Sequence, residues 1–535
     1  MAKNSPATTA EYYKKFIDAQ AARLRHEQWW RVATQHYYSR NPASLRNIYF
    51  FNIFVPYTYT IVESITARTV QEVYSTYPFL TVRPRYGSRD EELAQAIETL
   101  LLWVFENDDF NFIGALQAVV REAVLYGTGI FGITEIPAFD GQTTYYMPRL
   151  VWVPITEFYV DPRAVSLADA EYVIRRQFLP REEVERLAKA HGWKIPKEAL
   201  DAGTVATSIS EWNRILGLEE QTAPLPTGTV ELWQVLTPER IDYVVSRLWP
   251  IASYDLPLGR AQWPYVEVRW SGLPTSFWGV GVGRAIAGIQ RDLNILRMQR
   301  RHNVHMSLNK MFVGLYGAVR AGAHDRIVAR PGAILWETQP GALRELQFTD
   351  VTGSAYNEEM LLTRDLQLAA GEQDYNLGIA PQRSRERAMT VMRIQEAGLT
   401  RFSAFVRYLG SVTFRSLVKK IIVMLRQRLP RTVFLRIVEN EAGFYDKTPM
   451  ELLQMFDYVP YVGVDTRAKE TKLLTLIQAM PVLMQLPNIR RDWLAQRLLR
   501  LLGMDDWKSA IISDEELAAR AQALAAEQAI QQGGR

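Results

Sequence analysis

Arginine is concentrated in two segments of this chain, and the first runs from residue 284 to residue 310. That stretch holds six basic residues but a single acid, Asp292. Arginine binds phosphate oxygens without reading base sequence, so the pattern favours a helix face that meets a nucleic-acid backbone. A solvated helix face, or ion pairs between subunits, would show the same composition. The candidate contacts are Arg291, Arg297, Arg300 and Arg301.

The second concentration is Gln382-Arg-Ser-Arg-Glu-Arg387, in a polar stretch from 371 to 390 that contains Gly371, Gly378 and Pro381. Arginines at alternate positions of a flexible loop can touch phosphates without fixing the register of a duplex. The residues predicted to do so are Arg383, Arg385 and Arg387. The alternative is an ordinary exposed loop in which they pair with nearby acids, Glu372, Asp374 or Glu386.

Motifs for cofactor binding and catalysis are incomplete, and we expect no cofactor. Gly279-Val-Gly-Val-Gly283 resembles a dinucleotide-binding loop, but residue 284 is arginine and no βαβ unit surrounds it. A flexible junction before a helix is the favoured interpretation. No Gly-x-x-x-x-Gly-Lys-Ser/Thr segment occurs, which argues against a P-loop ATPase. The absence of cysteine excludes disulfides, cysteine-ligated zinc and thiol catalysis.

Other groups that could hold a metal have simpler interpretations. His302 and His305 lie three residues apart on a predicted helix, but no third ligand is evident. We expect them to face solvent or a channel, and we predict no metal site. The acidic pairs Asp108-Asp109 and Asp505-Asp506 lie near helix ends, where capping explains them.

The length, composition and net charge of the chain restrict the class of protein. The chain has 535 residues, enough for three or four structural units, with 62 basic and 58 acidic side chains and a formal net charge of +4. A protein that grips DNA along its whole surface is far more basic, so any DNA contact must be local or weak. We find no signal peptide and no apolar run of about 18 residues, so no membrane partner is expected. The lack of cysteine fits assembly in a reducing cytoplasm.

Apolar periodicity and turn residues predict alternating helices and strands. Gly127-Thr-Gly129 should end the helix that begins near residue 110. The widely spread tryptophans are expected in the core and at subunit interfaces. The predicted helices are about 10–38, 55–75, 90–106, 110–126, 181–191, 284–308, 354–370, 391–428 and 467–532. The predicted strands are 78–84, 130–136, 145–153, 157–161, 172–178, 229–236, 241–248, 264–270, 311–316, 333–337, 432–438 and 456–464, and 200–228 is predicted to be a loop or small insertion.

Several short motifs follow one another in an order that resembles a known family. They are Asn52–Pro56 leading into Val62–Arg68, then Ala123–Gly129, Val153–Pro162, Glu171–Arg176, Gly281–Gly283 with Gln290–Asn294, and Thr390–Gln395. Each motif alone is weak, but their order across about residues 10–430 resembles that of portal proteins, the head-to-tail connectors of tailed bacteriophages. The resemblance is greatest to the portals of short-tailed phages.

The resemblance implies a mixed α+β, multi-domain portal fold with an α/β wing, a helical stem, a small β-containing clip and an all-helical crown. Carried onto this sequence, residues 1–275 would be the N-terminal helix and wing. The remaining parts would be a stem helix at 276–310, the clip at 311–352, a second stem helix at 353–371, the tunnel loop at 372–390, a long helix and returning wing strands at 391–466, and the crown at 467–535.

The same resemblance implies a structural function rather than an enzyme. Portal subunits close into a ring, typically of about twelve copies, at one capsid vertex of the virion. Double-stranded DNA is packaged and ejected through the ring, which assembles in the host cytoplasm. The implied partners are further copies of the chain, the terminase large subunit, major capsid and scaffolding proteins, and tail adaptor proteins. The rival interpretations are another virion structural protein, such as a capsid or tail component, and a DNA-processing enzyme.

Overall fold

The computed structural model describes the chain in separate stretches. They are residues 6–42, 45, 51–75, 80–84, 91–139, 144–202, 229–308, 311–314, 340–341, 343–346, 352–371, 400–430, 433 and 456–460. Contacts divide the chain into two compact units, Met1–Tyr74 with Pro78–Val462, and Ser75–Tyr77 with Gly463–Arg535. Apart from Ser75, the described residues all belong to the first unit, so the architecture is that of this unit.

The larger of its main sheets is antiparallel, with the strand order β4-β5-β6-β7-β8. One face buries Tyr159, Ile174, Trp233 and Val235 together with residues of helix α1 (Pro6–Tyr37). The strands are β4 (Phe158–Val160), β5 (Val173–Pro180), β6 (Thr229–Leu236), β7 (Arg240–Val245) and β8 (Trp249–Asp255).

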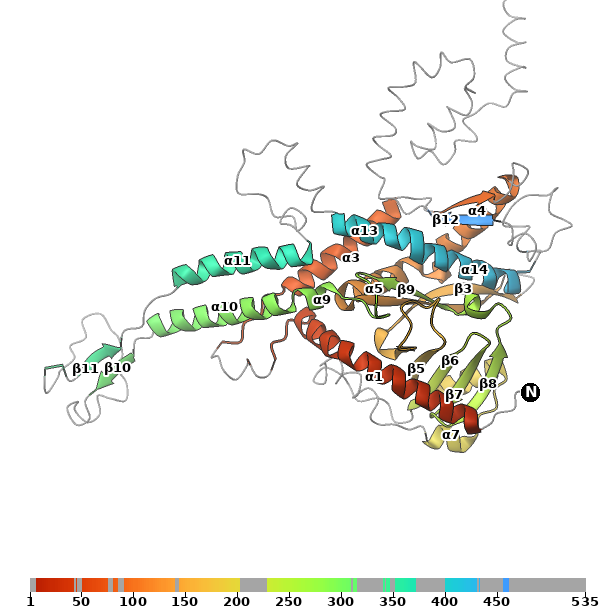
Figure 1. Cartoon of the computed structure of the whole chain (residues 1–535), viewed down its shortest axis with the longest axis horizontal. Helices are drawn as coiled ribbons and strands as arrows, with labels where there is room; N and C mark the ends of the chain where they lie inside the picture. The colour runs from red at the N-terminus through yellow and green to blue at the C-terminus, as the bar shows by residue number, and fades with distance from the viewer. Residues whose placement is uncertain are drawn as a thin grey trace, which may run out of the picture. The chain divides into compact units, whose positions relative to one another are not determined.

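Helix α1 packs along this sheet because one of its faces carries aromatic and small apolar side chains (Figure 1). The Phe16 ring lies 4.5 Å from the Trp233 ring, measured between centroids. Arg23 is fully buried on the same helix, and its guanidinium donates to the carbonyl oxygens of Thr156 and Phe158 at 2.9 Å each. These bonds satisfy N–H donors of Arg23, whose charge pairs with Glu27 at 2.7 Å, and they fix α1 to the edge of the sheet.

A second antiparallel sheet has the order β3-β2-β9, with β2 at Thr128–Phe139, β3 at Thr144–Val153 and β9 at Tyr265–Arg269. Helix α5 (Phe112–Tyr126) packs on it through a continuous buried face. The helix ends at Gly127, whose φ of 103° places it in the left-handed region and whose amide donates to the Ala123 carbonyl at 2.8 Å. The predicted glycine stop is confirmed.

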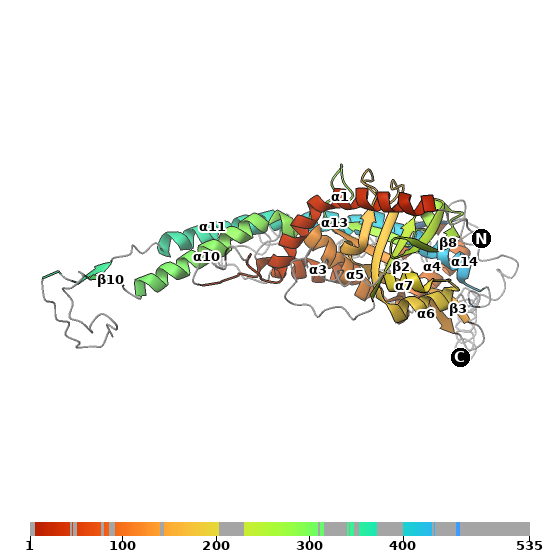
Figure 2. The same ribbon diagram turned by 90° about the horizontal axis from the view of Figure 1, so that it is seen from below.

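Two long helices form an antiparallel hairpin that follows a short helix, α9 (Val282–Ala285). Helices α10 (Ala287–Leu308) and α11 (Thr352–Ala370) lie side by side in Figures 1 and 2 and run in opposite directions. The chain between them contains β10 (Met311–Gly314) and β11 (Leu343–Leu346), which pair antiparallel.

The chain also contains a helix with a widened turn. Helices α13 (Thr400–Tyr408) and α14 (Arg415–Arg428) are joined by a π-helical turn at Leu409–Phe414, in which Thr413 donates to the Glu267 carbonyl at 3.3 Å. The other described elements are α3 (Tyr57–Ser75), α4 (Glu91–Glu106), α6 (Arg181–His191), α7 (Lys197–Ala202), β1 (Leu80–Pro84) and its antiparallel partner β12 (Phe456–Pro460).

The mixed helix and sheet composition confirms the α+β class, but several element predictions were wrong. The predicted strand 241–248 ends at Val245, and the chain turns back at Ser246 and Arg247 to form β8. Hairpin turns that need positive φ usually carry Asn or Gly. Because this turn is made by Ser and Arg, the hairpin had no signal in the sequence. Helix α7 was missed because six residues show no clear period.

Three further differences concern the hairpin helices and their neighbours. The predicted helix 284–308 is broken at Ile286, which separates α9 from α10. Strand β10 pairs with residues 343–346, whereas the predicted strand 333–337 lies outside the described residues. Of the predicted strand 432–438, only Val433 is described, and its backbone is helical. Residues 372–390 and 467–535 lie outside the described stretches, so the predicted tunnel loop and crown stay predictions, as do the domain boundaries.

Candidate nucleic-acid interface

The glycine-rich segment before α9 packs closely against the end of α5. A Cβ atom at Gly281 would lie 2.3 Å from the Leu125 carbonyl oxygen, and one at Gly279 would lie 2.4 Å from the Gly127 carbonyl oxygen. Only glycine permits so close an approach of two backbones. The predicted junction before a helix is confirmed at Gly279–Gly283, where α9 begins, but its close packing contradicts the predicted flexibility.

A buried cluster of side-chain amides anchors the first turns of α10. Gln290 and Asn294 are at most 1% exposed. The Gln290 amide donates to the Val55 carbonyl at 2.7 Å, and the Val55 amide donates to the Asn294 side-chain oxygen at 3.1 Å. Asn294 also donates to the Asn41 side chain at 3.3 Å. Because buried polar groups need their partners, this network ties α10 to the chain after α1 and to the chain before α3.

Two of the predicted phosphate-binding arginines meet a carboxylate of the opposite helix. Arg297 and Arg300 of α10 both form ion pairs with Glu359 of α11, one with each carboxylate oxygen. Glu359 is buried, and the Arg300 guanidinium also lies 4.1 Å from the centroid of the Tyr356 ring. Two arginines therefore neutralise one buried acid and hold the hairpin together, which reduces the charge they can offer to phosphate.

The other two predicted arginines of α10 are exposed. The Arg301 guanidinium lies over the Phe51 ring, 5.5 Å from its centroid, and no ion pair joins Arg291 or Arg301 to another described residue. Arg301 follows Arg291 by ten positions, which corresponds to a rotation of roughly 80° about the helix axis. The two side chains therefore leave α10 in different directions. Arg383, Arg385 and Arg387 lie outside the described residues.

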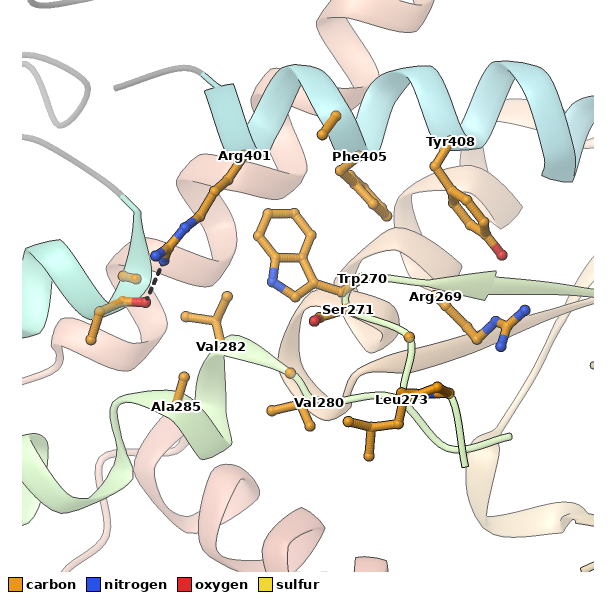
Figure 3. A pocket seen from close by; sticks show the side chains of 16 residues that line it. Arg269, Trp270, Ser271, Leu273, Val280, Val282, Ala285, Arg401, Phe405 and Tyr408 are labelled. Carbon is orange, nitrogen blue, oxygen red and sulfur yellow. Dashed lines mark hydrogen bonds between the residues drawn. The ribbon is translucent and has the colours of Figure 1, made fainter. Parts of the chain in front are cut away.

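A cavity of about 720 Å³ lies where α11 ends and α13 begins. Trp270, Val282 and Phe405 line it, and Figure 3 shows Arg401 reaching across it toward the last turn of α11. The Arg401 guanidinium donates to the Leu368 and Ala369 carbonyls at 3.5 and 3.2 Å. A cation at the C-terminus of a helix satisfies its unpaired carbonyls and its negative dipole end. This contact joins the two ends of the segment that carries the predicted loop arginines.

The histidines predicted to face solvent or a channel lie on the outer half of α10. His302 is exposed, and the half-buried His305 ring lies 5.3 Å from the Phe51 ring. In the stretches that the structure describes, no three acidic, histidine or cysteine side chains gather closely enough to bind a metal. Nor does any described helix have the length and apolar character needed to cross a membrane.

Sequence reasoning missed Glu359, the residue that organises the arginines of α10. Its helix was predicted, and the spacing of Arg297 and Arg300 by three residues places both on one side of α10. The pairing of α10 with α11 depends on a contact between segments 59 and 62 residues apart. Helical periodicity defines the faces of each helix, but it does not define the register between two helices.

Comparison with known families gives one finding. The model of a family described as phage SU10 portal protein matches residues 257–531, which include α10, α11, α13 and α14. No curated protein matches the chain.

Proposed function

This chain belongs to the phage SU10 portal protein family, and from that membership we propose that its copies close into a ring around a channel for double-stranded DNA. The ring would occupy one capsid vertex of the virion. It would dock the terminase large subunit during packaging and tail adaptor proteins afterwards, and it would contact major capsid and scaffolding proteins. Family membership is the single observation that carries this proposal.

The charge distribution supports passage of DNA rather than tight binding. The net charge of +4 is small for 535 residues, and α10 has two of its arginines paired with Glu359. In a ring, each remaining exposed arginine recurs in every subunit and contributes to a circular band of positive potential. Such a band attracts phosphate of any sequence, whereas a uniformly basic wall would hold the duplex and oppose its movement.

We assign the contacts with DNA to Arg383, Arg385 and Arg387, together with Arg301. Arg301 is exposed, and its described contact is with an aromatic ring rather than an acid. Arg297 and Arg300 are occupied by Glu359, and Arg291 leaves α10 in a different direction from Arg301. For Arg297 and Arg300 the geometry favours packing over contact with DNA, whereas Arg291 is exposed.

Replacing Arg383, Arg385 and Arg387 together by alanine tests this assignment. The triple variant should form rings as the parent does, because the substitutions leave the described elements unchanged, and it should package less DNA per capsid. The matched control is a triple replacement of exposed arginines on α1 and α6, Arg25, Arg31 and Arg186, by alanine. Normal packaging by the loop variant, or an equal loss in the control, would contradict the assignment.

A further inference from the structure

The stretch from α13 to α14 is basic along its whole length. Between residues 400 and 430 the sequence contains seven lysines and arginines and neither aspartate nor glutamate. The chain as a whole is nearly balanced, with 62 basic and 58 acidic residues. Figure 1 shows α13 and α14 following one line, so this excess of positive charge is spread along a single rod. Other parts of the protein, or a partner, must balance it.

Three of the seven cations have partners within the fold. The Lys420 ammonium donates to two backbone carbonyl oxygens at 3.1 and 2.8 Å. Arg428 forms an ion pair with Glu135 at 3.1 Å, and Arg401 donates to the last carbonyls of α11. These contacts tie the rod to its neighbours, so packing explains the three cations that make them.

The other four cations, which we call the basic strip, are Arg407, Arg415, Lys419 and Arg426. The first three are exposed and Arg426 is half-buried. No described residue forms an ion pair with any of the four. The Nε atom of Arg426 is shielded from solvent and has no hydrogen-bond partner among the described residues. Packing therefore does not account for the basic strip.

The π-helical turn brings the four cations into line. Lys419 and Arg426 follow Arg415 by four and eleven positions, about one and three turns, so the three side chains leave α14 on one side. In a regular α-helix the eight positions from Arg407 to Arg415 would exceed two turns by about 80°. The π turn takes up one extra residue, so these eight positions complete about two turns. The buried apolar residues of α14 lie on another side, where the helix packs against β3.

We propose that the basic strip binds the phosphate backbone of double-stranded DNA, as a second contact surface separate from Arg301 and the loop arginines. This inference rests on the proposed function only for the identity of the polyanion. From Arg407 to Arg426 the strip is about 28 Å long at 1.5 Å per residue, which matches roughly eight base pairs at 3.4 Å each. Arginine and lysine contact phosphate oxygens whatever the base sequence. Because a few such contacts bind weakly and are sensitive to salt, they are compatible with DNA that moves.

The composition of this surface favours DNA over an acidic protein segment. Interfaces between proteins usually centre on aromatic or aliphatic side chains that become buried, with polar groups around them. In the described stretch from 400 to 430, Val412, at 46%, is the one exposed large hydrophobic residue. A protein partner would find no apolar centre there, whereas a phosphate backbone needs only the row of cations.

The salt dependence of DNA binding tests the basic strip, because each phosphate contact contributes about 0.9 to the slope of log K against log salt concentration. Arg407→Gln, Arg415→Gln and Lys419→Gln together remove three charges and keep a similar helix propensity. They are introduced into the assembled loop variant, so that the loop arginines do not contribute. Anisotropy of a labelled duplex of about 30 base pairs gives the affinity from about 50 to about 200 mM salt. The slope should fall by about 2.7, so the loop variant should lose about 40-fold more affinity over this range than the protein that also lacks the strip.

The matched control replaces three exposed lysines of α1, α6 and α7, Lys14, Lys189 and Lys197, by glutamine in the same loop variant. It makes the same change of net charge outside the strip and should leave the slope unchanged. An equal slope with and without the strip, or an equal fall in the control, would overturn the inference while leaving the ring standing.

Chemical acetylation of lysine, measured by mass spectrometry, gives a second, independent readout. At a duplex concentration about ten times the Kd, Lys419 is free in about a tenth of the sites, so its acetylation should slow about tenfold while that of Lys189 stays unchanged. Equal acetylation of Lys419 with and without duplex would overturn the inference. Polyglutamate that protects Lys419 as fully as duplex of equal charge would assign the surface to an acidic protein and reject DNA. Parent protein that forms no ring would instead overturn the proposed function.

Discussion

Replacing Glu359 by glutamine should loosen the α10–α11 hairpin without unfolding the rest of the described unit. The glutamine keeps the size of the side chain and removes its charge, which leaves Arg297 and Arg300 without a counterion. The Arg300 side chain is 14% exposed and that of Arg297 is 36% exposed. Arg300 therefore loses its partner where little water can reach the guanidinium, whereas the guanidinium of Arg297 can form hydrogen bonds with water instead.

These exposures determine the size of the effect. Removing one partner of a buried ion pair costs about 3–5 kcal/mol, and loss of a solvent-exposed pair costs about 0–1 kcal/mol. Because Arg300 is not fully buried and glutamine can still accept one hydrogen bond, we expect about 3 kcal/mol in total. Since about 1.4 kcal/mol is a tenfold change in an equilibrium constant, local opening of the hairpin should become about 100-fold more frequent.

Hydrogen exchange measured by mass spectrometry reports that opening segment by segment. Amides of α10 and α11 should exchange about 100-fold faster in Glu359→Gln than in the parent, at equal protein concentration and assembly state. Amides of α5 and β2 should keep their rates. Glu358→Gln is the matched control, because it removes an adjacent but exposed carboxylate. Unchanged exchange in the hairpin, or equal acceleration by Glu358→Gln, would refute the role given to Glu359.

Four further substitutions test the packing and electrostatics of the described unit. Gly281→Ala would place a Cβ 2.3 Å from a carbonyl oxygen and should abolish soluble protein, whereas Gly288→Ala meets nothing within 4 Å and should stabilise α10 by about 0.5–1 kcal/mol in thermal unfolding. Glu231→Gln should destabilise by about 3–5 kcal/mol in urea unfolding, because Glu231 and Arg176 form an ion pair whose side chains are 1% and 2% exposed. Burial lowers the pKa of Lys420 from 10.5 to about 8, so the unfolded chain binds more protons between these values and this lysine makes stability rise with pH there. Unfolding measured from pH 8 to pH 10 should show a smaller rise for Lys420→Met, and an equal rise in the two proteins would contradict that origin.

The sequence predicted most of the described helices because their apolar faces repeat over many turns. Helix α5 is an example: its buried residues recur at three- and four-residue spacing, and Gly127 supplies the left-handed stop. The strands of the larger sheet were also predicted, apart from β8. That strand contains Pro250 and follows a turn made by Ser246 and Arg247, none of which signals a hairpin.

The candidate site was only partly predictable. Composition identified the arginines of α10, but it gave no means to separate those that bind Glu359 from those that stay exposed. The same limit applies to Gly279–Gly283, where the pattern of glycines was visible but the approach of α5 was not. In both cases the missing information is a contact between segments far apart in the sequence. Local periodicity does not depend on such contacts and therefore cannot predict them.

If copies of this chain surround an open axis, the mass of the native assembly must be a whole multiple of the mass of one chain. Native mass spectrometry of the purified protein, combined with symmetry from electron microscope images, should give one integer multiple of 61.4 kDa and a closed ring with a central hole. Protein that stays monomeric under assembly conditions, or that forms open filaments without a closed axis, would rule out the proposed ring.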